Sequence, residues 1–211
     1  MVTSFDGRCR QASGSDIATV ARIHINAFPD FFLTQLGYKF LCVMYRAFLS
    51  NPFGIFIVHQ SESGKLTGFA VGVFKSGEKD RWIALRFLPQ FFFAVLPAIV
   101  RHPKRIVLRL ASRFFDANPP FDVPHDAAVL RSIAVLPVEQ GGGAAAALID
   151  AFEQISVKHG ANYVYLTTDQ DNNERAQNFY KRHGYSVVKP FRQNNQRWMW
   201  LMSKSLREVC S

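Results

Sequence analysis

Three consecutive glycines between a strand-like and a helix-like segment constrain this chain more than any other feature. Residues 127–136 are mostly apolar, Gly141, Gly142 and Gly143 follow, and four alanines then open a periodic apolar stretch that ends at Gly160. This order predicts a strand, a loop and a helix, and its small residues would let a ligand lie against the backbone. The free amides at a helix start and the helix dipole favour phosphate oxygens. The segment predicts a phosphate-binding loop, with a flexible turn as the purely structural alternative.

Two common phosphate loops do not fit these residues. A nucleoside-triphosphate P-loop ends in Gly-Lys-Ser or Gly-Lys-Thr, whereas Gly143 is followed by Ala144 and Ala145. A dinucleotide-binding fingerprint also fails, because the glycines are contiguous and the next strand ends in residues 167–169 without a clear ribose-binding context.

The hydrophobic pattern predicts alternating helices and strands around this loop. Helices are expected at 16–27, with Asp16 as an acidic cap, and at 36–48, at 143–159 and at 173–183; strands are expected at 53–59, 67–74, 127–136, 163–168, 185–188 and 197–202. Strands alternating with helices indicate a mixed sheet covered by helices, an α/β or α+β fold. At 211 residues and 48% hydrophobic content, one globular domain over 1–211 is expected and intrinsic disorder is excluded.

Charge and cysteine content narrow the class of protein. The net charge of +9 favours an anionic partner, either a polyphosphate cofactor or an anionic membrane surface. We find no nucleic-acid-binding motif and predict no nucleic-acid partner. Cys9, Cys42 and Cys210 are too few and too widely spaced for a disulfide framework or a zinc site, and the first thirty residues lack a signal peptide. A cytoplasmic protein is therefore expected, either free or peripheral at the inner membrane.

A helical insertion is predicted at about residues 75–125, where prolines separate segments rich in Phe, Leu, Ile and Arg. Its apolar stretch at 83–100 is too short and too interrupted to span a membrane. Two interpretations of residues 82–115 remain. One is a lid or a dimer surface, which leaves a homodimer open, and the other is an amphipathic segment whose phenylalanines enter a membrane beside Arg101 and Lys104.

Two motifs, one strand and one helix apart, are more specific. The first, from Gln140 to Ala145, has the pattern Gln/Arg-x-x-Gly-x-Gly/Ala and follows a Val-x-Pro. The second, from Asn173 to Tyr185, has the pattern Asn-x-x-Ala-x-x-x-Tyr-x-x-x-Gly-Phe/Tyr. Together they resemble the acetyl-CoA loop and the following helix of the GNAT superfamily of N-acetyltransferases, over about residues 127–190.

This resemblance implies a GNAT fold, with the insertion between the third and fourth strands, and acetyl-CoA as the acyl-donor cosubstrate. The residues that it assigns to acetyl-CoA binding are Ile133, Ala134, Val135, Gln140, Gly141, Gly142, Gly143, Ala144, Ala145, Asn173 and Tyr180. The loop amides would hold the diphosphate, and the strand would pair with the pantetheine arm. A bulge would aim the amide of Val135 at the thioester oxygen.

Side-chain roles follow from the same resemblance. Asn173 would hydrogen-bond the pantetheine chain, or could simply cap the helix. Tyr180 is the one residue assigned to catalysis, as the acid that protonates the departing thiolate, and its alternative is an ordinary buried aromatic residue. The strand before the loop carries no carboxylate to serve as general base. His24 and Asp30 lie where GNAT proteins line the acceptor pocket, but neither is assigned to catalysis, and no metal site is predicted.

The sequence therefore predicts transfer of an acetyl group to a primary amine of a small molecule. The resemblance further suggests an amino sugar, as in acetyltransferases of bacterial surface-polysaccharide pathways. Two alternatives remain open. The chain could be a GNAT-like module that binds coenzyme A without catalysis, or a membrane-associated acyltransferase that acts on a lipid-linked acceptor.

Overall fold

A seven-stranded mixed sheet forms the centre of the computed structural model, which describes residues 7–74, 86–101, 123–193 and 197–207. The strand order is β1-β2-β3-β4-β5-β7-β6. Only β4 and β5 are parallel, and every other neighbouring pair in this sheet is antiparallel. The bounds are β1 Cys9–Gln11, β2 Gly54–Gln60, β3 Leu66–Phe74, β4 Ala127–Val135, β5 Tyr163–Asp169, β6 Ser186–Gln193 and β7 Arg197–Ser205. The predicted mixed sheet is confirmed.

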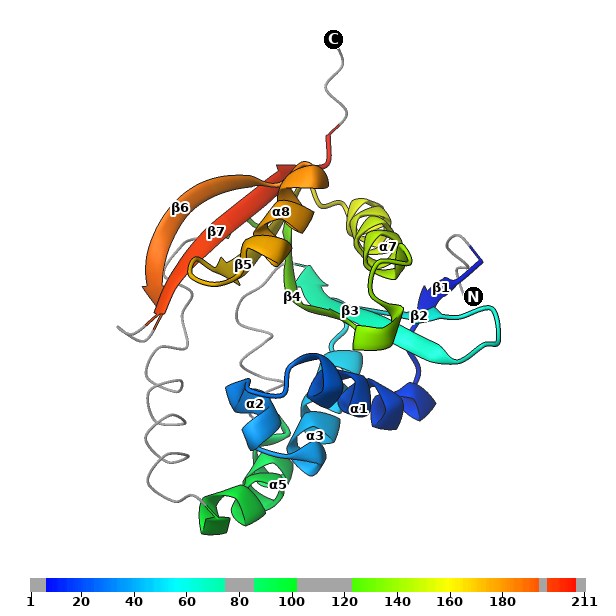
Figure 1. Ribbon diagram of the computed structural model, residues 1–211, viewed down its shortest axis with the longest axis vertical. Coiled ribbons are helices and arrows are strands. Elements are labelled where there is room, and N and C mark those ends of the chain that lie inside the picture. The colour runs from blue at the N-terminus through cyan, green and yellow to red at the C-terminus, as the bar shows by residue number, and fades with distance from the viewer. Residues whose placement is uncertain (1–6, 75–85, 102–122, 194–196, 208–211) are drawn as a thin grey trace.

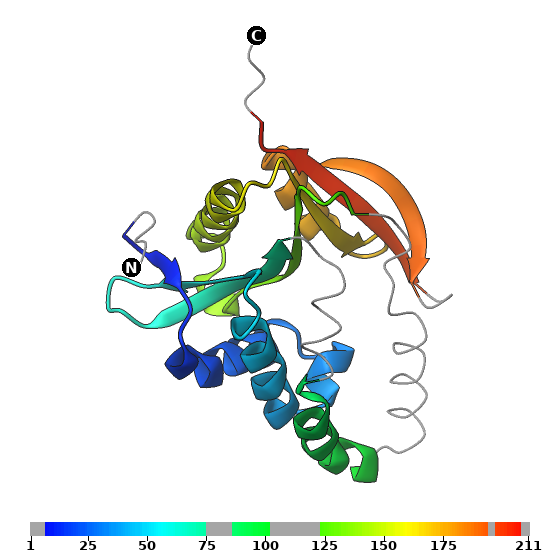
Figure 2. The same cartoon turned by 180° about the vertical axis from the view of Figure 1, so that it is seen from behind.

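Helices cover both faces of the sheet (Figures 1 and 2). Their bounds are η1 Gly14–Asp16, α1 Ile17–Ala27, α2 Phe32–Gln35, α3 Tyr38–Leu49, α5 Leu88–Arg101, η2 Pro137–Glu139, α7 Ala144–Lys158 and α8 Glu174–Arg182. On one face α1 and α3 pack against β2 and β3, and on the other α7 packs against β1 to β4. At Gly72 a Cβ would lie 2.2 Å from the carbonyl oxygen of Val129 and 2.6 Å from the Phe152 ring, so this glycine lets α7 approach the sheet closely.

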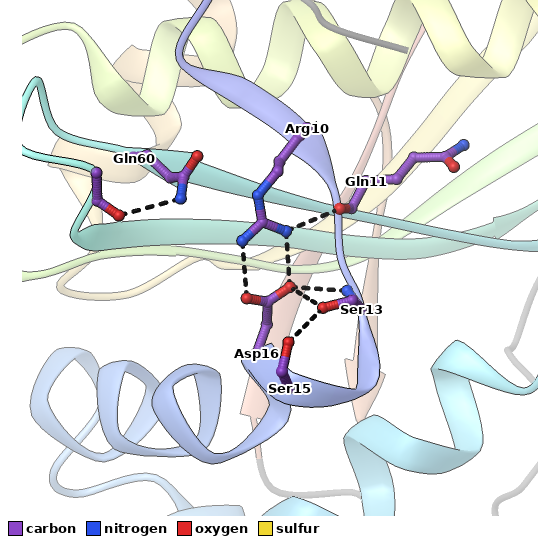
Figure 3. Close-up of polar contacts among 7 residues, drawn as sticks. Arg10, Gln11, Ser13, Ser15, Asp16 and Gln60 are labelled. Carbon is purple, nitrogen blue, oxygen red and sulfur yellow. Dashed lines mark hydrogen bonds and ion pairs between the residues drawn. The ribbon is translucent and has the colours of Figure 1, made fainter. Parts of the chain in front are cut away.

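Asp16 has a different role from the predicted cap of the first helix. Its carboxylate makes no capping bond to α1, and instead accepts hydrogen bonds from both terminal nitrogens of Arg10, at 2.7 and 2.8 Å. It also accepts from the backbone N–H and the hydroxyl of Ser13 (Figure 3). The Arg10 guanidinium is the main reason that the pKa of Asp16 falls to about 2. The pair ties β1 to the start of α1.

The predicted element order is confirmed, but several boundaries differ. The pattern missed β1, a three-residue edge strand, and the single turn α2, which Gly37 separates from α3 with a φ of +94°. It also ended the strand predicted at 185–188 five residues too early, because exposed β6 lacks a buried alternation. Of the predicted insertion, residues 86–101 are described and contain α5, whereas residues 75–85 and 102–122 lie outside the described residues. None of the helices described here has the length and apolar character needed to cross a membrane.

Candidate active site

The site is centred where β4 and β5 separate. Their parallel pairing runs only from Ala127 opposite Tyr163 to Leu130 opposite Leu166. Beyond this point β4 continues along β3, while β5 continues along β7 (Figure 1). A register shift opposite Val71 and Gly72 places a bulge in β4 near residue 131, four residues before Val135. Residues 132–135 thus have no strand partner on the β5 side among the described residues.

The backbone of β4 presents alternate residues to this opening. The N–H of Leu136 donates to the carbonyl oxygen of Thr67 at 2.8 Å, and Ala134 pairs with Phe69 in the same register. Successive residues of an antiparallel strand point their N–H and C=O groups to opposite edges. Ala134 therefore faces β3, whereas Ile133 and Val135 face the opening. In agreement, the carbonyl oxygen of Val135 accepts a hydrogen bond from the side-chain amide of Gln140 at 3.3 Å.

The glycine loop leaves six consecutive amides without acceptors. The first helical bond of α7 runs from the N–H of Ala147 to the carbonyl oxygen of Gly143, at 3.0 Å. The N–H groups of residues 141–146 donate to no residue in the part of the chain that the structure describes. Residues 140–143 are exposed, and no side chain caps α7. This array of donors at a helix start suits an anion with several oxygens.

Only two of the three glycines are required by the backbone. Gly141 and Gly143 have φ values of +93° and +84°, which disfavour a residue with a side chain. Gly142 has no such conformation, and a Cβ there would touch only the carbonyl oxygen of Glu139, at 3.6 Å. The fold therefore tolerates a side chain at Gly142, so its bare backbone is available for a ligand.

Asn173 lies at the N-cap position of α8 but does not use its side chain as a cap. Its side-chain amide donates instead to the hydroxyl of Thr168, at 2.7 Å, near the carboxyl end of β5. Asn173 therefore occupies the expected N-cap position, but it caps α8 through its carbonyl oxygen, which accepts from the N–H of Gln177, and not through its side chain. The bond to Thr168 orients the carboxamide along β5, the strand that borders the opening.

Tyr180 is buried on α8 between two aromatic rings. Its ring makes edge contacts with Phe179 at 5.4 Å and with Tyr185 at 5.8 Å. Burial raises its pKa to about 12, and its hydroxyl makes no hydrogen bond to any described residue. The phenol thus keeps its proton at neutral pH, as a proton donor must.

His24 is a core residue rather than an exposed base. Its Nδ1 shares a 2.7 Å hydrogen bond with the Tyr45 hydroxyl, while Nε2 is buried without a partner among the described residues. Burial between Phe28 and Phe69 lowers its pKa to about 4, so the ring is neutral at pH 7. Asp30, the other acceptor-side candidate, is exposed.

Sequence reasoning missed a cluster that joins three distant segments. The Nε of Arg197 donates to Asp169 at 2.9 Å, and a second guanidinium nitrogen contacts the other carboxylate oxygen. The same guanidinium lies 5.6 Å from the centre of the Phe31 ring. The cluster connects the segment after α1 with the carboxyl end of β5 and the start of β7. Its members show no shared spacing, so no sequence signal could have paired them.

A model of the acetyltransferase (GNAT) family matches residues 107–185. Over these residues the chain is similar to the GNAT family. Its fold is shared with an Escherichia coli ribosomal-protein-S18-alanine N-acetyltransferase, at 15% identity and a TM-score of 0.59, over 100% of this chain and 99% of that one. It is also shared with the yncA protein of Salmonella typhimurium, at 14% identity, a TM-score of 0.60, and coverage of 96% and 95%. A search of curated protein sequences gave no match.

The matched family is one of acetyltransferases, and the yncA structure was solved with its cofactor acetyl-CoA. The donor set of this chain suits that cosubstrate, because six amides without acceptors among the described residues adjoin a strand edge that has no strand partner on the β5 side. Among the described residues, no three His, Cys, Asp or Glu side chains gather as metal ligands.

Proposed function

We propose that this GNAT enzyme transfers the acetyl group of acetyl-CoA directly to a primary amine of a small molecule, with both substrates bound together. The observation that supports this most is the run of six amides without acceptors at 141–146, next to the unpaired edge of β4. Diphosphate and pantetheine need these two kinds of backbone donor side by side.

Donor binding is assigned mainly to backbone groups. The amides from Gly141 to Ala146 bind the diphosphate, and the absence of a side chain at Gly142 permits its approach. Ile133 and Val135 bind the pantetheine arm through the edge that faces the opening. The carboxamide of Asn173, oriented by Thr168, adds a side-chain contact.

Chemistry then requires one stabilised oxygen and two proton movements. The amine nitrogen attacks the thioester carbon, the new C–N bond forms, and the C–S bond breaks. The N–H of Val135 stabilises charge on the carbonyl oxygen, and Tyr180 gives its proton to the leaving sulfur. No carboxylate lies on residues 131–135, and His24 is neutral and buried, so the proton of the amine leaves through water.

The acceptor is proposed as a small-molecule primary amine, with amino sugars as the first class to test. Thiol release with an amine panel, followed by mass spectrometry of the product, identifies it. Acetyl-CoA binding without thiol release for any amine would instead support a non-catalytic module.

Donor binding is tested by placing a negative charge in the glycine loop. Gly142→Asp should weaken acetyl-CoA binding, measured by calorimetry, by roughly 100-fold, since it adds bulk and charge beside the diphosphate. Gly14→Asp is the matched control, because Gly14 also lacks a positive φ and has open space around a Cβ. Equal affinities for the two variants would contradict the assigned site.

A further inference from the structure

Helix α5 exposes an unusually apolar outer face. Five of the twelve large hydrophobic residues exposed in the described part of the chain lie on this helix. They are Leu88, Phe92, Phe93, Leu96 and Val100, which we call the outer face of α5. Phe93 is 70% exposed and Val100 81% exposed. At helical spacing the five residues lie on one side with no polar residue among them.

The opposite side of α5 is already occupied by the protein. Val95 and Ala98 pack with Leu36, and Phe91 contacts Phe40 at 5.2 Å between ring centres. In both views α5 lies on the outer side of α3, away from α7 and α8 (Figures 1 and 2). The outer face therefore points away from the donor site, which argues against a lid over acetyl-CoA.

Positive charge near the outer face of α5 favours an anionic lipid surface over a second copy of the chain as its partner. In the described part of the chain, elements α2, α3 and α5 carry Lys39, Arg46 and Arg101 but no Asp or Glu. A second copy of the chain would bring like charges together at the contact. An anionic lipid surface instead attracts the cations and accepts the apolar side chains.

We propose that the outer face of α5 docks on an anionic phospholipid membrane. The helix is about 21 Å long at 1.5 Å per residue, so it lies along the interface. Docking goes beyond the acetyl transfer proposed above and does not depend on it. It would bring the enzyme to acceptors held at a membrane.

Sedimentation of the full chain with lipid vesicles tests this surface. Binding is expected to vesicles of phosphatidylglycerol and phosphatidylcholine, and to fall with added salt. The double variant Phe92→Ser with Phe93→Ser should lower the affinity for these vesicles by roughly tenfold or more, because two apolar side chains are lost from the contact. The double variant Val187→Ser with Val188→Ser is the control, since it removes two adjacent exposed residues of β6.

A charge-reversal variant and a measurement of acetyl-CoA affinity distinguish loss of vesicle binding from loss of folding. Lys39→Glu with Arg46→Glu, both exposed on α3, should also weaken vesicle binding. Acetyl-CoA affinity, measured on each variant, should not change, which shows that the variants are folded and separates this surface from the donor site. Equal vesicle binding by the Phe92/Phe93 and Val187/Val188 variants would overturn the proposal. So would a concentration-dependent dimer without vesicle binding that the Phe92/Phe93 variant abolishes.

Discussion

The two faces of the central sheet differ in the groups that they present: backbone amides on the α7 side and packed side chains on the α1 side. On the α7 side, the proposed donor site consists of the backbone amides at 141–146, which have no acceptor among the described residues, and the edge of β4. On the α1 side, the same sheet is covered by packed aromatic side chains, in which His24 and Tyr45 form a buried hydrogen bond. The first side is therefore sensitive to changes that remove an N–H or fill a space, and the second to changes in burial and charge.

The largest effect is expected from removing one backbone amide on the donor side. Val135→Pro deletes an N–H that faces the opening and takes no part in the β3 ladder, so the chain should still fold. Loss of this oxyanion donor should lower kcat, measured on the amine found in the panel, by roughly 10²- to 10³-fold. Ala134→Pro is the contrasting change, because it removes an N–H that pairs with Phe69, and it should prevent folding. Unchanged turnover in folded Val135→Pro would remove Val135 from the mechanism.

A second prediction concerns Tyr180, the donor-side residue proposed to transfer a proton through its side chain. Tyr180→Phe should lower kcat roughly 100-fold while the Kd for acetyl-CoA stays nearly constant, because only proton transfer to sulfur is lost. Since burial raises the pKa of Tyr180 to about 12, ionisation of this phenol should not limit activity between neutral pH and pH 10. The control is Tyr185→Phe, whose hydroxyl is buried without a partner among the described residues and should be dispensable. Equal turnover in the Tyr180 variant and the unaltered enzyme would reject the acid role.

The same contrast explains what could be predicted from the sequence. Backbone binding demands small residues at fixed spacing, so a candidate loop at residues 140–145 can be proposed from the sequence, and Asn173 and Tyr180 are proposed from a second motif at α8. The contact of Arg197 with Asp169 and Phe31 depends on how three segments meet in space, and no local pattern encodes it. The role of Asp16 was misread for a related reason, because its partner Arg10 lies on a strand too short to be recognised.

On the α1 side, the buried His24 should make the stability of the fold depend on pH. The pKa of His24 is about 4 in the fold and near 6.5 when exposed, so the unfolded chain binds more protons between these values. Stability should therefore be complete above pH 6.5 and fall as pH drops, by about 2 kcal/mol between pH 7 and pH 5. His24→Gln should flatten this slope in urea unfolding, whereas the exposed-site control His159→Gln should not. Asp16 has a pKa of about 2, so its protonation destabilises the fold only at pH values below 5. If the free energy of unfolding of His24→Gln fell with pH as steeply as that of the unaltered protein, another group would cause the pH dependence.

The smallest expected effect is on stability, and it compares a loop glycine that has a positive φ with one that does not. Gly143 has a φ of +84°, but a Cβ there would meet no atom within 4 Å, so Gly143→Ala incurs only backbone strain. Its free energy of unfolding should fall by about 1 kcal/mol. Gly142→Ala, without a positive φ, should change stability by less than about 0.5 kcal/mol, measured in the same urea titrations. If both variants lost equal stability, the loop would be held by contacts to its glycines rather than by the left-handed turn that orients its amides.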